Sequence, residues 1–580
     1  MSAARVRATT TARQAGRLML TVDEIGRITS VVDRRHPERP FLVGVDLAPA
    51  TVNGEIRSWL DREVAVDDDE IDVTMRHPDS LDINLRHSLS TGWATRLLIV
   101  NTGAKPLVVD RLPLVVRSAP GRLVSGIAAG SRLCWATEAE DGRGPLLTAR
   151  LTAGVVASIE PEHLELGGLR LAPGQRYVAQ LRWELLATPR SVVTGPGRDV
   201  LLVRTVYEID EPALLPDDPD AALVVPRDVA VDSFEEADAA GREVFAPDPG
   251  RHQVELRSAE GDVHWELSWV RPLAAQLQDW AEVVLSRPRT PVGVVSIDDL
   301  PSAIVLQAAL GGGGLEDADD AADALDLPTA RLLDHAESEP GADPLAVLYL
   351  LGEHGRTGDP DVFDAALDRL EPLVAHDAPP VPGLGLAVLR MVLATASSDL
   401  GASTAGRVSS VVARSAAAAA GHLAAHSAGG GIEEDLDDPS GVAQARVVNA
   451  VRLAAELELL LAVQPLLPPA PGHHWRMSEL VRVLGAALGG GLPGRLLRPP
   501  PVIEHAYLVA VLRMLPEDGY AEITKSWGAP LTILARRATL EVLDRLTLGT
   551  DAGPDPITRI DPDSQTATAA AWLALVQRHG

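Results

Sequence analysis

The sequence predicts a multidomain protein with antiparallel β-sandwich structure in its N-terminal half and an all-α helical domain in its C-terminal half. Two features along the chain lead to this prediction. From about residue 17 to about residue 285, short apolar runs alternate with turn residues, which is typical of strands. After about residue 300 the apolar residues recur with a helical period. The length of 580 residues also exceeds that of one ordinary domain.

The first 199 residues are expected to form one β-sandwich domain. Two apolar runs, 94–100 and 107–116, flank the turn Asn101-Thr102-Gly103, whose Asn and Gly suit a tight turn. Residues 176–186 alternate apolar and polar side chains with a period of two, as a half-buried strand does. Strand–turn units at this spacing favour a sandwich. Trp183 is therefore expected in its core.

Residues 200–299 are expected to form a second β subdomain with a linker. An acidic, proline-containing stretch near residues 210–220 is typical of a solvated loop. The runs 254–257 and 263–270 read as a hairpin, with Trp265 and Trp269 in the core. These residues could equally supply the closing strands of the first sandwich, so the domain boundaries are hypotheses.

Residues 300–580 are expected to form about eleven or twelve helices. Asp343-Pro344 and Asp359-Pro360 each place an N-cap residue before a proline, which is a common helix start. Gly352 falls inside one predicted helix, at a cost of about 1 kcal/mol relative to alanine. Proline-rich breaks at 465–471 and 499–501 separate further helices.

The composition excludes several classes of function. The net charge of −29 disfavours nucleic acid and anionic membranes as partners, because both are negatively charged. The single cysteine, Cys134, excludes a disulfide framework within the chain, and its neighbour Trp135 favours a buried, inert thiol. The apolar stretch 18–22 is too short for a signal peptide. The strong bias towards arginine, with Lys105 and Lys525 as the two lysines, is typical of a GC-rich bacterial genome, and we predict a soluble cytoplasmic protein.

Two short segments resemble a known enzyme architecture. Gly26-Arg27-Ile28-Thr29-Ser30 is similar to the G-x-I-x-S opening strand of N-terminal supersandwiches, and 349–363 contains a Thr357-Gly358-Asp359 turn common in helical toroids. With the β-then-α order, the chain resembles glycoside hydrolases of the glucoamylase-like and glycogen-debranching-like type. The resemblance implies an (α/α)6 toroid, in intact or degenerate form, and a carbohydrate ligand. It also implies cleavage of a glycosidic bond by paired carboxylates without a cofactor.

The best catalytic candidates under this resemblance are Glu433 and Glu434. They follow three glycines in an acidic loop, where crowded carboxylates raise one another's pKa. The partner carboxylate could be Glu504, which follows a proline run, or one of three aspartates at 518, 561 and 563. The alternative interpretation is a solvated acidic turn that caps the next helix, and for Glu504 an ordinary cap.

The substrate-binding candidates are His473, His474, Trp475 and Arg476, with Trp527 as a further aromatic face. Imidazoles, an indole and a guanidinium at a helix start could line a sugar or anion pocket, although an ordinary loop-to-helix junction gives the same pattern. His422 and His426 lie four residues apart on one helix face, but no third ligand has metal-site spacing, so no metal is predicted.

Other signatures are incomplete. The glycines at 311–314 lack the Lys-Ser/Thr of a P-loop, the acidic run 316–323 lacks the central Gly and terminal Glu of an EF-hand, and no G-x-S-x-G is present. Aromatic residues make up 3% of the chain, which leaves few faces for stacking on sugars. The alternative function is therefore a non-catalytic interaction or scaffold protein that binds a protein partner.

Overall fold

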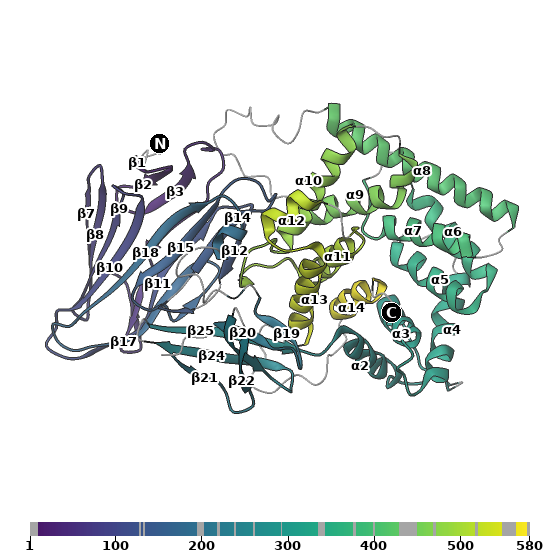
Figure 1. Cartoon of the computed structure of the whole chain (residues 1–580), viewed down its shortest axis with the longest axis horizontal. Helices are drawn as coiled ribbons and strands as arrows, with labels where there is room; N and C mark the ends of the chain where they lie inside the picture. The colour runs from purple at the N-terminus through teal and green to yellow at the C-terminus, as the bar shows by residue number, and fades with distance from the viewer. Residues whose placement is uncertain are drawn as a thin grey trace, which may run out of the picture.

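The computed structural model places the β-rich and the helical halves side by side (Figure 1). The structure describes residues 10–576 except for 127–128, 132–133, 194–201, 203, 217–220, 237–238, 259–260, 292, 335–342, 375–378, 398–400, 429–448, 468–470, 517–519 and 548–563. Strands precede α2 and helices follow it, apart from the short α1 (Arg190–Val193) and β26 (Arg495–Leu496). The predicted order of a β-sandwich half and a helical half is confirmed.

Two large antiparallel sheets, which we call sheets A and B, pack face to face in the N-terminal half. Sheet A has the order β1 (Thr11–Ala15), β2 (Leu18–Val22), β3 (Ile28–Asp33), β4 (Leu42–Leu47), β11 (Leu107–Ser118), β17 (His163–Leu171) and β16 (Ser158–Ile159), with β5 (Ala50–Val52) on β11 and β6 (Glu55–Arg57) on β5. Sheet B has the order β26, β12 (Arg122–Gly126), β14 (Cys134–Ala139), β15 (Leu146–Ala153), β18 (Arg176–Leu186), β10 (Trp93–Asn101), β9 (Leu81–Ser88), β8 (Glu70–His77) and β7 (Asp61–Val66).

One apolar core joins the two sheets. Leu20 and Val45 of sheet A and Val73 and Leu97 of sheet B belong to the same buried cluster. The predicted alternation in β18 is confirmed, because Ala179, Leu181 and Trp183 are buried and their neighbours are more exposed. In the core, Trp183 stacks on Trp93 with ring centroids 4.2 Å apart.

The turn after β10 connects the two sheets instead of closing a hairpin. β10 pairs with β9 and β18 in sheet B, whereas β11 pairs with β4, β5 and β17 in sheet A. Asn101 holds this crossing with its side-chain amide, which donates to the carbonyl oxygens of Lys105 at 2.8 Å and Leu171 at 2.9 Å.

Two smaller sheets follow in the chain. The first has the order β13 (Ala129–Gly130), β25 (Gly261–Val270), β24 (Gly250–Ser258) and β21 (Ala222–Val224), with β19 (Val206–Glu208) parallel to β25. The second has the order β20 (Ala213–Pro216), β23 (Ala239–Phe245) and β22 (Ala230–Glu236).

The expected hairpin near residue 260 is present, because β24 pairs antiparallel with β25. Trp265 and Trp269 lie in a separate core cluster, as predicted from the sequence. The boundaries at 199/200 and 299/300 remain predictions, and we propose that the helical half already begins at α2, whose Leu277 joins the helical core.

Six helices form a closed circuit of contacts. In order around the circuit they are α3 (Leu300–Gly311), α5 (Pro344–Thr357), α7 (Leu384–Ser397), α9 (Ala450–Val463), α11 (Val502–Arg513) and α14 (Ser564–Leu575), and α14 contacts α3 again. The first five each pack on one further helix or more, from α2 (Leu273–Leu285), α4 (Ala318–Asp334), α6 (Pro360–Leu373), α8 (Ala402–Ala428), α10 (Pro471–Ala487) and α13 (Leu531–Thr547). The short α12 (Ala521–Trp527) and the 3-10 helix η2 (Gln464–Leu466) complete the described helices.

Helix starts follow the predicted signals. The carboxylate of Asp343 accepts from the backbone N–H of Leu345 at 2.9 Å, and that of Asp359 accepts from Asp361 at 2.9 Å. A proline occupies the first turn of both helices. The caps satisfy backbone donors that the helix itself leaves open.

The circuit of helices is filled by side chains. Residues 505–512 of α11 are all buried, a run longer than two helical turns, so every face of the helix is covered. Residues 569–575 of α14 are also buried. Alanine, leucine and valine dominate this core. In the described part of the chain, the middle of the helical half is thus a packed apolar core.

Candidate functional site at the interdomain seam

The two halves meet along one edge of sheet B. The chain segment after α10 adds β26 to β12, so that a strand of the helical half extends the sandwich sheet. We call this contact region the interdomain seam. Its apolar part is a buried cluster with members from both halves, Leu123, Ala136, Leu146, Val192, Ala486, Leu492 and Leu496. Such a junction joins the halves and also brings polar side chains from distant segments together.

The turn between β14 and β15 is the sandwich side of the seam. Asp141 accepts from Arg39 at 2.6 Å and from the backbone N–H of Arg143 at 3.0 Å. Gly142 has φ 64°, and a Cβ there would come within 2.9 Å of the side chain of Arg482 in α10. Glycine fits both the left-handed backbone and the close approach. The turn is thereby held against the helical half.

A buried ion-pair network continues from this turn into the helices. Arg143 pairs with Glu479 of α10, and Glu479 also accepts from Arg476 at 3.0 Å. Arg476 makes a two-pronged contact with Glu456 of α9, with Nε–Oε1 and Nη2–Oε2 distances of 2.9 Å. Bidentate guanidinium–carboxylate pairs are strong and geometrically specific. The network therefore fixes α9, α10 and the β14–β15 turn relative to one another.

Glu138 is a buried carboxyl in the seam. Its pKa is raised from the ordinary 4.5 to about 8, mainly by burial and also by the nearby Asp141, while Arg122 lowers it in part. Its Oε2 has no hydrogen-bond partner among the described residues. The position of a Cβ on Gly490 would lie 3.6 Å from this oxygen and 3.3 Å from Nε1 of Trp527. At neutral pH the group is a protonated acid beneath a glycine turn.

Trp527 lies beside the same glycine turn. It is buried, and its ring lies so close to Gly485 that a Cβ there would approach within 2.0 Å. A Cβ on Gly491 would meet the backbone oxygen of Trp527 at 2.1 Å. Gly485 is thus required by the indole of Trp527, and Gly491 by the backbone of the same residue. The tryptophan that the sequence singled out as a sugar platform is covered in this conformation.

The raised pKa of Glu138 predicts a pH-dependent stability. Because the folded state holds the proton more tightly than the unfolded chain, the contribution is fully present below about pH 4.5 and is lost as pH rises towards 8. Glu138→Gln should remove this part of the slope, on the order of 1 kcal/mol per pH unit. Urea denaturation of both proteins between pH 5 and 8 measures the difference. If the stabilities of the two proteins changed equally with pH, the assignment would be contradicted. Both proteins are expected to keep some dependence of stability on pH, because burial also raises the pKa of Glu458 to about 7.

The predicted cluster at the start of α10 divides into exposed and buried members. His473 is half-buried, His474 is exposed and Trp475 has 54% of its surface exposed, whereas Arg476 is buried in the ion-pair network. The structure therefore brings Arg476 to Glu456 and away from a surface pocket. Consecutive helical residues point in different directions, so the four side chains do not line one pocket.

The predicted carboxylates are not brought together among the described residues. Glu433 and Glu434 lie outside the described residues, as do Asp518, Asp561 and Asp563. Glu504 is exposed in the first turn of α11, a favourable place for an acidic side chain at a helix N-terminus. His422 is half-buried, and the side chain of His426 is not among those described. No group of three metal-ligating side chains occurs in the described part of the chain.

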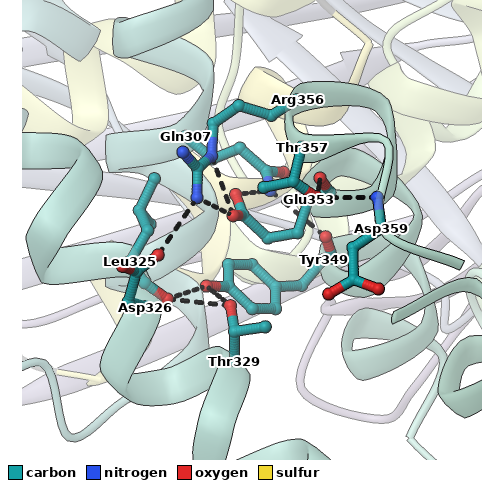
Figure 2. Close-up of polar contacts among 9 residues, drawn as sticks. All are labelled: Gln307, Leu325, Asp326, Thr329, Tyr349, Glu353, Arg356, Thr357 and Asp359. Atoms are coloured by element: carbon teal, nitrogen blue, oxygen red, sulfur yellow. Dashed lines mark hydrogen bonds and ion pairs between the residues drawn. The ribbon is translucent and has the colours of Figure 1, made fainter. Parts of the chain in front are cut away.

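The Thr357-Gly358-Asp359 turn joins two helices. Gly358 ends α5 with φ 72°, Thr357 donates to the backbone oxygen of Glu353 at 2.8 Å, and Asp359 caps α6. Figure 2 shows the turn beside a buried polar cluster. The motif therefore has a structural role in this chain.

The cluster in Figure 2 ties α3, α4 and α5 together. Glu353 is fully buried and accepts from Gln307 at 2.6 Å and from Arg356 at 2.6 Å. The hydroxyl of Tyr349 donates to the backbone oxygen of Leu325 at 2.8 Å. A Cβ on Gly352 would overlap Gln307 at 2.1 Å, which explains a glycine inside α5. These polar groups satisfy one another and hold neighbouring helices.

A second buried carboxylate holds α7 to α9. Glu458 accepts from the hydroxyl of Tyr507 at 2.7 Å and from the backbone N–H groups of Gly383 at 2.9 Å and Leu386 at 2.8 Å. It thereby caps the start of α7 from another helix. Sequence reasoning missed Glu138 and Glu458 because neither belongs to a local motif that indicates burial.

Comparison with known proteins gives a likeness of fold and no likeness of sequence. No protein-family model matches the chain, and no curated protein matches it. The structure of a polysaccharide lyase, BACCELL_00875, aligns with 98% of this chain and 100% of its own, with a TM-score of 0.68 and 11% identity. The fold is that of a solved polysaccharide lyase.

Two further solved structures match with low overall similarity. Glycoside hydrolase family 81 from Clostridium thermocellum covers 92% of this chain and 85% of its own at 10% identity, with a TM-score of 0.23. Galactose 1-epimerase from Lactobacillus acidophilus covers 31% of this chain and 93% of its own at 10% identity, with a TM-score of 0.20. The predicted resemblance in the order of parts is confirmed by the lyase fold. No helix among the described residues is long and apolar enough to cross a membrane.

Proposed function

We propose that this chain is a carbohydrate-active protein that handles its glycan beside the interdomain seam. The support is the full-length likeness of fold to a protein named as a polysaccharide lyase. It is joined by the buried carboxyl of Glu138, which lies where the two halves meet. Ligand sites commonly form at domain junctions, where several segments contribute side chains. We further propose that the closed circuit of helices is an (α/α)6 toroid.

In the catalytic form of this proposal, two carboxyl groups cleave a glycosidic bond by general acid/base chemistry. The acid must be protonated near neutral pH, and the pKa of Glu138, raised by burial to about 8, meets that condition. The glycine turn with Gly490 covers Glu138, so this turn has to move before a substrate can reach the acid. Glu433 and Glu434 remain proposed acids and Glu504 a proposed partner, because these three follow from the resemblance.

The test is an activity screen with isosteric variants. The chain is incubated with a panel of polysaccharides, and new reducing ends are measured along with the ultraviolet absorbance of unsaturated ends, which separates hydrolysis from elimination. Glu138→Gln is expected to lower kcat by about 10² to 10⁴, the usual contribution of a general acid. Glu458→Gln is the matched control, since this carboxyl is equally buried but lies in the helical core. Full activity of Glu138→Gln would remove Glu138 from the mechanism.

The second candidate function is a non-catalytic interaction protein. It is favoured by the apolar filling of the helical circuit, where residues 505–512 are buried on every side. The buried carboxyl groups of Glu353 and Glu458 in this region are engaged in hydrogen bonds that hold neighbouring helices. In that case the lyase-like fold would bind a glycan or a protein without turnover. Calorimetric binding of an oligosaccharide, with no product formed over a long incubation, would support this function and argue against the catalytic one.

A further inference from the structure

Arg537 of α13 holds the chain segment that covers Glu138. Its Nη1 donates to the backbone oxygen of Leu492 at 2.7 Å, and its Nη2 donates to that of Gly494 at 2.7 Å. Its Nε donates to Glu541, one turn further along α13, at 3.1 Å. The side chain of Arg537 is 7% exposed. A buried guanidinium of the helical half is therefore spent on two backbone carbonyl groups of the interdomain seam.

The two carbonyl groups belong to a stiff part of this segment. They flank Pro493, whose ring fixes its own φ and favours extended backbone at Leu492. The glycine turn, Gly489–Gly491, precedes them and has no side chains to restrict its backbone. The backbone N–H of Leu492 donates to the oxygen of Gly489 at 2.8 Å. The position in which Arg537 holds Leu492 therefore also sets the position of the glycine turn.

The glycine turn lies directly over the carboxyl group of Glu138. The Cβ position on Gly490 is 3.6 Å from Oε2, and Glu138 is 3% exposed. The charged groups that act on Glu138 are Arg122 of β12 and Asp141 of the β14–β15 turn, whereas the glycine turn and Trp527 bring no charge. The glycine turn therefore acts on Glu138 by excluding water, which disfavours the ionised carboxylate.

We propose that Arg537 is a positioning residue: by holding two backbone carbonyl groups it keeps the glycine turn closed over Glu138 and water away from the carboxyl group. A guanidinium suits this task because its rigid, planar fork presents several donors at once. A lysine ammonium keeps the charge but loses the fork. The inference deepens the proposed function and rests on it for any effect on catalysis, whereas the effect on Glu138 is measured without a substrate.

The test compares Arg537→Lys with Arg536→Lys. Arg536 is the matched control, since it is the preceding residue of α13 and pairs with Glu208 at 3.1 Å and Glu211 at 3.2 Å, away from the glycine turn. Both substitutions keep one positive charge, so Glu541 is not left as an unpaired buried carboxylate, and both variants are expected to fold. Each chain is made with and without Glu138→Gln, and its free energy of unfolding is measured by urea denaturation between pH 4 and 9.

The expected result is a shift in the pH at which Glu138 stops affecting stability. The difference in unfolding free energy between the Glu138 and Glu138→Gln forms falls as pH rises and levels off at the folded-state pKa of Glu138. For the parent chain and Arg536→Lys this is expected at about pH 8. For Arg537→Lys it is expected at least about one pH unit lower, because water near the carboxyl relieves part of the desolvation. Taking the difference isolates Glu138 from Glu541, whose pKa burial also raises.

Hydrogen exchange followed by mass spectrometry gives a second readout. Peptides that contain the glycine turn should exchange faster in Arg537→Lys than in the parent chain, and at the parent rate in Arg536→Lys. A merely structural role of Arg537 would lower stability equally at every pH. Levelling off at the same pH in all three chains, or unchanged exchange of the glycine turn in Arg537→Lys, would overturn the proposal.

Activity separates this proposal from the proposed function. If Glu138 is the general acid, the alkaline limit of kcat in Arg537→Lys moves down by the same shift as the pKa of Glu138. A shifted pKa with no activity in any chain would support the positioning role and count against the catalytic function. Activity that depends on Glu138 but has the same pH profile in Arg537→Lys and the parent chain would overturn the positioning role alone.

Discussion

Arg476→Ala is expected to lower the free energy of unfolding by about 3–5 kcal/mol, the usual effect of removing one partner from a buried ion pair. Arg476 is 4% exposed and contacts both Glu456 and Glu479. Its removal leaves two buried carboxylates with fewer compensating charges, and charge burial without a partner is costly. Urea denaturation followed by circular dichroism measures the change.

The matched control for this prediction is Arg407→Ala. Arg407 also connects carboxylates of another helix, since it pairs with Asp368 and with Glu371, the latter at 3.0 Å, but its side chain is 34% exposed. Solvent-exposed ion pairs contribute about 0–1 kcal/mol. The two substitutions remove the same group and differ in burial. Equal effects on unfolding would show that burial of the Arg476 network is not what stabilises it.

Gly385→Ala is expected to destabilise the helical half by about 1–3 kcal/mol or more, the range for overpacking. A Cβ on Gly385 of α7 would lie 2.4 Å from the backbone carbon and oxygen of Glu458 in α9. A backbone cannot rotate away as a flexible side chain can. The helices would have to separate, and this would also stretch the bonds from Gly383 and Leu386 to the Glu458 carboxylate.

Gly355→Ala in α5 is the control for Gly385→Ala. Gly355 is exposed, and nothing lies within 4 Å of the position of its Cβ. Alanine there reduces the freedom of the unfolded chain and should stabilise the protein by about 0.4–1 kcal/mol. The two glycine-to-alanine substitutions, which lie in neighbouring helices, are therefore expected to change the free energy of unfolding in opposite directions. A stabilising Gly385→Ala would contradict the close contact of α7 and α9.

Local signals in the sequence were sufficient to predict many of the strands and helices and their order along the chain. The period of two in residues 176–186 became β18, and the Asp-Pro pairs at 343–344 and 359–360 became capped helix starts. These features depend on residues within a few positions of one another, as caps and strand alternation do. The turn at Asn101 follows from its own residues, whereas the placement of its two flanking strands in different sheets does not, because strand pairing is not local.

The interdomain seam could not be read from the sequence in the same way. Arg476 was predicted beside its neighbours on the surface, yet its partner Glu456 is 20 residues away. Glu138 meets the turn containing Gly490 only because β26 joins β12. One signal was available: with Trp135 facing the sandwich core, alternation places Glu138 on the outward face of β14.

The sequence alone determined that β structure precedes helical structure, where many strands and helices begin, and that the chain is strongly acidic. Only the tertiary structure decided that Glu138 is buried with a raised pKa and that Arg476 pairs with Glu456 in the buried network of the seam. The physical reason is the distance along the chain over which each kind of interaction acts. Periodicity and capping act over one or two turns of chain, whereas burial and strand register depend on segments that meet only when the core forms.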